Sequence, residues 1–244
     1  MSEYRNRIYR YYVSARDEAL APADTNGFNP RAPYLNRLIR NHFPADRNAA
    51  IIDLGCGHGA LIHFARLAGY QNMRGVDVSP EQVSAAKKLG IEGVEQADLL
   101  SFLSLLQAES ADLVIAFDVI EHFTKDELFG FVDQVHRVLK RNGRWIIHTT
   151  NGESPFFGRS RYGDLTHELT FTRRSIHQVL LSCGFHNIRC FEDTPVLHGV
   201  KSVIRWGLWK IIRSVLRLYI AAETGDTDSG IIFTQNFLAV AEKR

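Results

Sequence analysis

The sequence predicts an α/β fold in which helices cover both faces of a mostly parallel sheet. Short apolar runs typical of strands alternate with amphipathic runs of about ten to fifteen residues typical of helices. A glycine-rich segment follows the first predicted strand, and acidic residues end several strands. The chain has 244 residues, of which 45% are hydrophobic, enough for one large core. We expect a binding site where the carboxyl ends of the parallel strands meet.

Seven strands are predicted in order along the chain. Each is a short run rich in branched apolar residues and bounded by turn-forming or acidic residues. They cover residues 50–54, 73–78, 93–97, 112–117, 144–149, 188–192 and 231–241.

Helices are predicted between these strands. A helix over 60–68 follows the glycine segment, and the next begins at Ser79-Pro80-Glu81, where serine is a good cap and proline suits the first turn. Residues 124–139 carry apolar side chains at helical spacing, and Asn142-Gly143 predicts a turn into the fifth strand. A helix over 172–183 is expected to stop at Gly184.

The clearest motif is DLGCGHG at residues 53–59. Glycines allow a tight turn and let a ligand approach the backbone closely. The third glycine comes one residue earlier than in the dinucleotide fingerprint, and Asp53 precedes the first glycine by two residues. Such an acid suits a positively charged ligand without phosphates better than a pyrophosphate.

Two more acids follow the next two strands. Asp77 ends the second strand, where a carboxylate can accept hydrogen bonds from both hydroxyls of a ribose. Asp98 follows the third strand and could accept a hydrogen bond from an adenine amine, with Leu99 as an apolar wall.

DLGCGHG (53–59), GVDVSPEQ (75–82), QADL (96–99) and FDVIEH (117–122) together resemble the class I S-adenosylmethionine-dependent methyltransferases, over roughly residues 35–193. The resemblance implies a Rossmann-like seven-stranded sheet with an antiparallel last strand, and S-adenosylmethionine as cofactor. It assigns cofactor binding to Asp53, Gly55, Cys56, Gly57, Gly59, Asp77, Val78, Asp98, Leu99 and Phe117.

The catalytic candidates are His167, His122 and Asp118. The resemblance places Asp118 near the substrate, and a hydroxyl acceptor profits from a general base such as histidine. His167 is favoured because it lies on the loop after the fifth strand; the alternative is a structural hydrogen bond that anchors the loop. For His122 the alternative is a helix-cap contact, and His148 is expected to be buried. The chain lacks the proline-proline-aromatic motif of enzymes that methylate amino groups of bases.

Asp118, Glu121 and His122 also resemble the metal-binding cluster of quinone-ring O-methyltransferases. That family carries a glutamate where Asp118 stands, and we expect that no metal is needed.

Charge is unevenly distributed along the chain. Residues 1–47 carry eight basic and five acidic residues, residues 194–244 carry seven and four, and the middle carries 14 and 18. This is too weak for a nucleic-acid-binding face, and no nucleic acid is expected as partner. Residues 1–47 are expected to form a helical cap over the cofactor mouth, with tyrosines among arginines. Residues 48–244 would form the methyltransferase domain, with an amphipathic helix inserted at 197–222.

The helix at 200–222 has five cations and no acid. Its cations cover one broad face, with Trp206 and Trp209 on or beside it, and its apolar residues form the opposite face. It is either a surface for an anionic membrane or partner, or an ordinary surface helix that packs its apolar stripe on the sheet. The apolar stripe is Val200, Ile204, Leu208, Ile211, Val215 and Leu218.

A weaker resemblance links the chain to methyltransferases associated with bacterial surface-polysaccharide synthesis. It runs from Thr149 through GDLTHELTFT (163–172) to Gly184-Phe185, followed by Pro195, His198-Gly199 and Glu223-Thr224-Gly225. It implies methylation of a sugar hydroxyl in a glycan or glycolipid precursor. Methylation of a small aromatic or quinone-type hydroxyl is an alternative, as is a non-catalytic methyltransferase-like partner subunit.

The predicted compartment is the cytoplasm, with peripheral contact at the inner face of the membrane. Arginines interrupt any apolar run at the N-terminus, and no run of 18 apolar residues occurs. Three cysteines without a CxxC pair fit reduced thiols rather than a disulfide framework or a zinc site.

Overall fold

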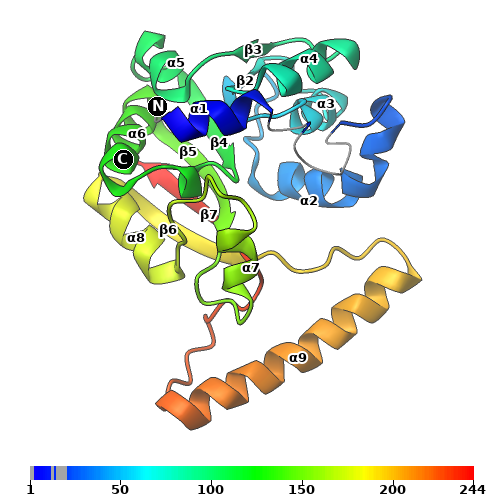
Figure 1. Cartoon of the computed structure of the whole chain (residues 1–244), viewed down its shortest axis with the longest axis vertical. Coiled ribbons are helices and arrows are strands. Elements are labelled where there is room, and N and C mark those ends of the chain that lie inside the picture. The colour runs from blue at the N-terminus through cyan, green and yellow to red at the C-terminus, as the bar shows by residue number, and fades with distance from the viewer. Residues whose placement is uncertain (1–2, 12–13, 15–20) are drawn as a thin grey trace.

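A computed structural model describes residues 3–11, 14 and 21–244, and shows a seven-stranded sheet in the order β3-β2-β1-β4-β5-β7-β6 (Figure 1). The predicted strand at 231–241 begins later, at Asn236, and the predicted strand at 188–192 begins earlier, at Phe185. The strands are β1 (Ile51–Leu54), β2 (Met73–Asp77), β3 (Val94–Gln96), β4 (Ala111–Phe117), β5 (Leu139–Thr150), β6 (Phe185–Glu192) and β7 (Asn236–Lys243).

Strand direction confirms the predicted fold class. β1, β2, β3, β4 and β5 pair in parallel, whereas β7 lies antiparallel between β5 and β6. The strand order reverses at β1, which has β2 on one side and β4 on the other. Crevices outside the carboxyl ends of strands at such a point are the usual ligand sites of open α/β sheets.

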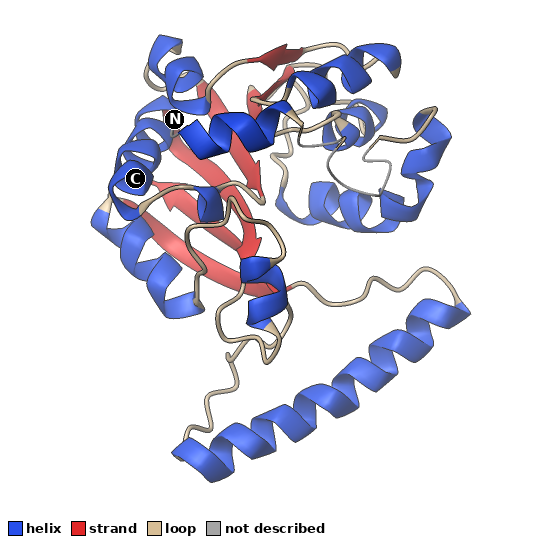
Figure 2. Ribbon diagram, in the orientation of Figure 1, coloured by secondary structure: helices blue, strands red, loops and turns tan. Residues whose placement is uncertain are grey.

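Helices cover both faces of this sheet (Figure 2). They are α1 (Glu3–Arg10), α2 (Ala32–His42), α3 (Ala60–Leu67), α4 (Pro80–Lys88), α5 (Leu99–Leu105), α6 (Lys125–Val138), α7 (Phe157–Tyr162), α8 (Arg173–Ser182) and α9 (Val200–Thr224), with the 3-10 turns η1 (Thr25–Arg31) and η2 (Ile120–His122).

Side chains alternate between the two faces of each central strand, which gives two hydrophobic clusters. Ile51 and Ile115 pack with α2, α3 and α4, whereas Ile52 and Ala116 pack with α5, α6 and α8. Because α2 contributes Leu38 to the first cluster, this part of the predicted cap at 1–47 shares the core of the sheet. The domain boundary at residue 47 stays a prediction.

The remaining differences from the predicted elements are local. β5 begins at Leu139, because the chain pairs at once with Ala111 and then bulges; Asn142, where a turn was predicted, has a φ of 62° within this strand. Helices α5 and α7 were not predicted, since seven and six residues give too few helical repeats to recognise. Within the described ranges, no helix has the length and apolar character needed to cross a membrane. Tyr12 of the predicted cap lies outside the described residues.

Candidate functional site

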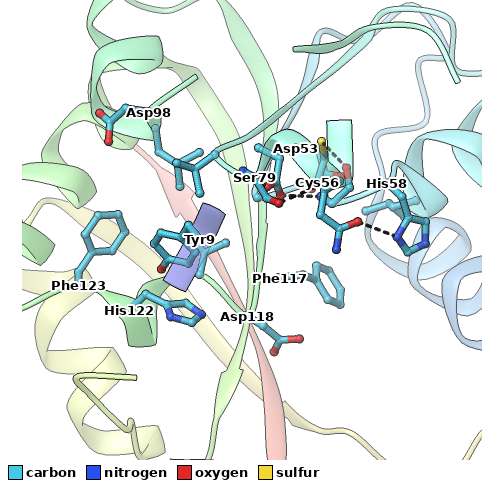
Figure 3. A pocket seen from close by; sticks show the side chains of 18 of the residues that line it. Tyr9, Asp53, Cys56, His58, Ser79, Asp98, Phe117, Asp118, His122 and Phe123 are labelled. Carbon is cyan, nitrogen blue, oxygen red and sulfur yellow. Dashed lines mark hydrogen bonds between the residues drawn. The ribbon is translucent and has the colours of Figure 1, made fainter. Parts of the chain in front are cut away.

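A cavity of about 700 Å³ lies at the carboxyl ends of the central strands (Figure 3). This volume is typical of small-molecule sites. Of the predicted cofactor residues, all but Gly59 line it, and so do His122 and Asp118. The predicted residues that line the cavity are Asp53, Gly55, Cys56, Gly57, Asp77, Val78, Asp98, Leu99, Phe117, Asp118 and His122.

The glycine loop requires glycine at the positions that turn the chain. Gly55 has a φ of 72°, and a Cβ there would lie 2.5 Å from a methyl group of Val119. Gly59 has a φ of 80° and caps the N-terminus of α3, so it shapes the loop without lining the cavity. A side chain at either position would strain the backbone.

Asp77 fixes the loop to the end of β2. One of its carboxylate oxygens accepts from the backbone N–H of Gly57 and the other from that of Ser79, both at 2.8 Å. These bonds leave further acceptor sites on the carboxylate for a ligand. Burial nevertheless raises the pKa of Asp77.

Asp53 is the buried carboxyl of the site that has no partner among the described residues. It is 2% exposed and lines the cavity, and within the described residues no hydrogen bond or ion pair reaches it. Burial, with the nearby charge of Asp77, raises its pKa to about 8. A buried acid without a partner is costly unless a cation or donor pairs with it. The site therefore suits a ligand that brings positive charge to Asp53.

Asp98 caps a helix and also lines the cavity. Its carboxylate caps α5 by accepting from the backbone N–H of Ser101 at 3.0 Å, and the same residue lines the cavity beside Leu99. The capping bond fixes the orientation of this carboxylate.

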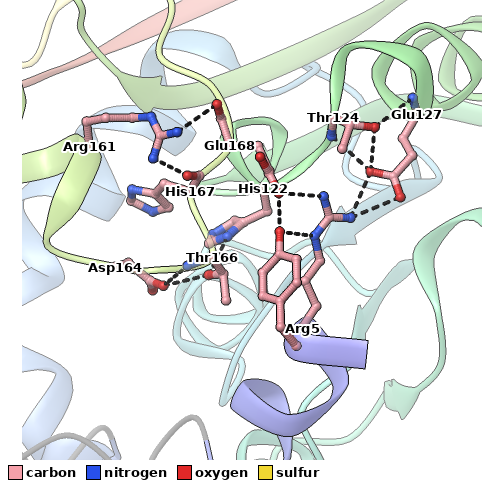
Figure 4. A network of polar contacts seen from close by, with 10 residues as sticks. Arg5, His122, Thr124, Glu127, Arg161, Asp164, Thr166, His167 and Glu168 are labelled. Carbon is pink, nitrogen blue, oxygen red and sulfur yellow. Dashed lines mark hydrogen bonds and ion pairs between the residues drawn. The ribbon is translucent and has the colours of Figure 1, made fainter. Parts of the chain in front are cut away.

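His122 is held in a defined protonation state by a short relay (Figure 4). The Thr166 hydroxyl donates to Asp164 at 2.6 Å, so its oxygen accepts from Nδ1–H of His122 at 2.8 Å. Burial, together with the charge of His167, lowers the pKa of His122 to about 4. At neutral pH the ring is therefore uncharged, with Nε2 as the nitrogen that carries the lone pair.

His167 lies outside the residues that line the cavity. Its Nδ1 donates to the backbone carbonyl of Ser160 at 2.7 Å, and Arg161 donates to the carbonyls of His167 and Glu168. These contacts tie the loop before α8 to α7, as the structural alternative expects. The role of His167 as base stays a prediction, but the geometry favours His122.

A different residue contacts each side chain of the possible metal cluster Asp118, Glu121 and His122. Asp118, with a φ of 53°, contacts Nδ1 of His148 at 2.7 Å, and Glu121 is fully buried and accepts from Thr149 at 2.8 Å. Within the parts of the chain that are described, no three metal-ligating side chains gather closely enough to hold an ion. That no metal is needed stays a prediction. His148 is buried as expected.

The N-terminal segment supplies lining residues that the motifs did not reveal. Arg5, Asn6 and Tyr9 of α1 line the cavity, and so does Arg31 before α2. Arg5 bridges α1 to Glu127 at 2.7 Å, which holds the helix over the mouth as the cap prediction expects. The sequence signalled this only as tyrosines interspersed with arginines.

The cavity fits S-adenosylmethionine in the chemistry of its donors and acceptors. Among the described residues Asp53 has no partner and lines the cavity, glycines form the loop beside it, and the acids Asp77 and Asp98 end or follow two neighbouring strands. Residues 52–147 match the family described as a methyltransferase domain. This part of the chain resembles a methyltransferase domain. Together with the unpaired acid in the cavity, this match supports an enzyme that uses S-adenosylmethionine and argues against the non-catalytic alternative.

Known proteins similar to this chain include methyltransferases of the same fold. A SAM-dependent methyltransferase from Archaeoglobus fulgidus superposes with a TM-score of 0.66 at 19% identity, covering 87% of this chain and 94% of that one. A ubiquinone biosynthesis O-methyltransferase from Xylella fastidiosa is 25% identical over 163 residues, 62% of this chain and 65% of that protein. Cyclopropane mycolic acid synthase 3 of Mycobacterium tuberculosis is 27% identical over 136 residues, 50% of this chain and 44% of that protein. The matched region thus covers about half to two thirds of these two curated relatives.

Proposed function

We propose that this methyltransferase transfers a methyl group to a hydroxyl oxygen, with His122 as general base. The observation that carries the proposal is a neutral histidine in the cavity whose other nitrogen is fixed by the Thr166–Asp164 relay. S-adenosylmethionine, when bound, supplies a methyl group on a sulfonium that a nucleophilic oxygen can attack in line.

The chain's own residues hold this cofactor by charge and hydrogen bonding. Asp53 would pair with the positive amino-acid end, and Arg31, also in the cavity wall, would bind its carboxylate. Asp77 would accept from the ribose hydroxyls, and Asp98 with Leu99 would contact the adenine.

His122 would take the proton of the acceptor hydroxyl on Nε2. The resulting imidazolium keeps its Nδ1–H bond to Thr166, which Asp164 polarises, so the new charge is stabilised where it forms. Tyr9 lies edge-on to the His122 ring, with 6.1 Å between ring centroids, and limits the approach of water.

The acceptor that this base serves best is an acidic hydroxyl of a phenol or quinone precursor. A base whose conjugate acid has a pKa of about 4 accepts a proton more readily from a phenol than from an aliphatic alcohol. Phe117, Phe123 and Leu35 give the cavity apolar walls suited to a flat ring. The ubiquinone biosynthesis O-methyltransferases among the similar proteins agree with this acceptor class.

A sugar hydroxyl of a glycan or glycolipid precursor is the second candidate. The cavity mouth carries Arg5, Asn6 and Glu127, polar groups that could hold the many hydroxyls of a sugar ring. The weaker resemblance around 163–172 also supports this acceptor.

An acceptor panel separates the two candidates. The purified protein is given S-adenosylmethionine and, separately, a catechol, a glycolipid with free sugar hydroxyls and a primary amine, and kcat/KM is measured for each. We expect the catechol to give the highest value, with an O-methyl ether as product. Turnover of the glycolipid alone would transfer the assignment to the second candidate, and turnover of the amine alone would contradict hydroxyl methylation.

A further inference from the structure

The helix α9 exposes the face that a surface helix ordinarily buries. Only Ser202 among its 25 residues is buried, and in Figure 1 the helix stands away from the sheet on two connecting segments. The structure therefore does not show an apolar stripe packed on the sheet. The exposed fractions of the large apolar side chains on this face lie between 49% and 78%, for Val200, Val203, Ile204, Leu208, Ile211, Ile212, Val215, Leu218 and Tyr219.

The contacts that hold α9 come from its opposite, cationic side. Arg213 binds Glu192 at 2.9 Å and donates to the carbonyls of Ser229 and Ile231 at 3.2 Å. These bonds turn the charged side toward the domain. The apolar stripe then faces away from the domain, where an exposed patch of this kind marks an interaction surface.

The charge of α9 selects among the occupants of that surface. Lys201, Arg205, Lys210, Arg213 and Arg217 are its cations, and its one acid, Glu223, lies in the last turn. Two copies of the helix placed face to face would bring these cations together with almost no acid to offset them. A partner with an apolar interior and a negatively charged outer boundary would match both the apolar stripe and the cations of α9.

We propose that α9 lies in the surface of an anionic lipid bilayer, with its apolar stripe in the boundary between headgroups and acyl chains. Lys201 and Arg205 border the stripe on one side and Lys210 on the other, so their stems can reach outward to lipid phosphates. Trp206 lies beside Lys210, with its ring 5.2 Å from the ammonium, and so belongs to the cationic side rather than to the stripe. The helix would lie along the surface over about 37 Å, at 1.5 Å per residue.

Vesicle binding tests the proposal without any methyl acceptor, so its outcome is independent of the proposed function. The full chain is sedimented with phosphatidylglycerol–phosphatidylcholine vesicles and with pure phosphatidylcholine vesicles. We expect binding to the anionic vesicles that weakens between about 0.1 M and about 0.5 M NaCl. Ile211→Glu should lower the partition coefficient at least about tenfold, and Lys201→Gln with Arg205→Gln about twentyfold.

Matched variants elsewhere control for the change itself. Leu105→Glu places the same charge on an apolar residue that is 86% exposed on α5, and Lys87→Gln with Lys88→Gln removes two exposed cations from α4. Both should bind vesicles as the unaltered chain does, and circular dichroism melts should show that all variants fold. The proposal is overturned if the unaltered chain ignores anionic vesicles at low salt, or if Leu105→Glu loses binding equally. A dimer that Ile211→Glu dissociates, without vesicle binding, would overturn it in favour of a second copy.

Discussion

At the scale of single residues, Asp53 couples cofactor binding to pH. Its pKa of about 8 means that the carboxyl is largely protonated at pH 7, whereas a cationic ligand binds the ionised form. We therefore expect the affinity for S-adenosylmethionine to rise as pH increases from about 6.5 toward 8.5, with protons released on binding. Calorimetry at several pH values, in buffers of different ionisation enthalpy, measures both quantities.

Asp53→Asn provides the control for that pH dependence. The amide keeps the shape and cannot ionise, so affinity should fall at high pH and its pH dependence should flatten. If Asp53→Asn retains the same slope, another group controls the coupling and the assignment of Asp53 is wrong.

His122 and His167 make a matched pair for the proton transfer. His122→Ala should lower kcat by about 100-fold or more, the usual contribution of a general base, with cofactor affinity nearly unchanged. His167→Ala should lower kcat less than tenfold, since its ring donates to the Ser160 carbonyl. Raising the pH should partly rescue His122→Ala if a missing base is the cause. A larger loss in His167→Ala than in His122→Ala would return the role to His167.

Sequence reasoning placed most of the predicted cofactor residues in the wall of one cavity, because each lies at or near a strand end. His167 lies on the predicted loop but does not line the cavity, because the loop turns at Asp164 and places Thr166 against His122. A side chain's direction within an irregular loop depends on local hydrogen bonds, which spacing does not encode.

At the scale of elements, α1 acts as a cap whose attachment depends on Arg5. This side chain is 4% exposed and bridges to Glu127 and Glu168 across more than 120 residues of chain. Arg5→Gln removes a buried charged contact, and we expect the KM for S-adenosylmethionine to rise about tenfold with a smaller effect on kcat.

Arg7→Gln is the matched control for the cap, since Arg7 lies two positions further on the same helix and its side chain is 78% exposed. Its KM should equal that of the unaltered chain. If Arg5→Gln lowers the melting temperature and leaves KM unchanged, α1 stabilises the fold without covering the site.

The predictability of the elements follows their periodicity. The long helix α6 and the apolar strand β4 were predicted within two residues, because both repeat their pattern several times. The first residue of β7 was predicted five residues too early, because Ile231, Ile232 and Phe233 read as strand although they precede it. The orientation of α9 was left open by its sequence, since either face of an isolated amphipathic helix can meet the domain.

At the scale of the whole molecule, several buried groups hold protons in the folded state. Burial raises the pKa of Asp53 and of Glu121 to about 8, and although burial opposes the charge of His148, Asp118 and Asp193 raise its pKa to about 10. Above pH 6.5 the two carboxyls of the unfolded chain have already lost their protons, and its histidine loses its proton at a lower pH than in the folded chain. The folded chain therefore binds more protons than the unfolded chain. Stability must therefore fall as pH rises from about 6.5 toward 10.

Thermal unfolding of the ligand-free protein between pH 6.5 and pH 9.5 measures this slope. We expect the melting temperature to decrease steadily, and Glu121→Gln to make the decrease shallower between pH 6.5 and 8. A melting temperature that rises over this range would contradict the assigned protonation states.

The mostly parallel sheet and the edge that holds the site were predictable from the sequence, because alternation of strand and helix favours a parallel sheet with its site at the carboxyl ends of the strands. The contacts that bring residues far apart in the chain together in the cavity wall were not predictable. Arg5 of α1 contacts Glu127 of α6 only in the folded chain, and the sequence around either residue does not indicate this contact.

The most direct test of the account is to follow a methyl group labelled with carbon-13 from S-adenosylmethionine to a catechol acceptor. The account predicts one O–methyl signal in the product spectrum, formed by the unaltered chain and lost in His122→Ala, whose cofactor affinity is kept. A label found on nitrogen, carbon or sulfur would contradict it. So would cofactor binding with no transfer to any hydroxyl acceptor.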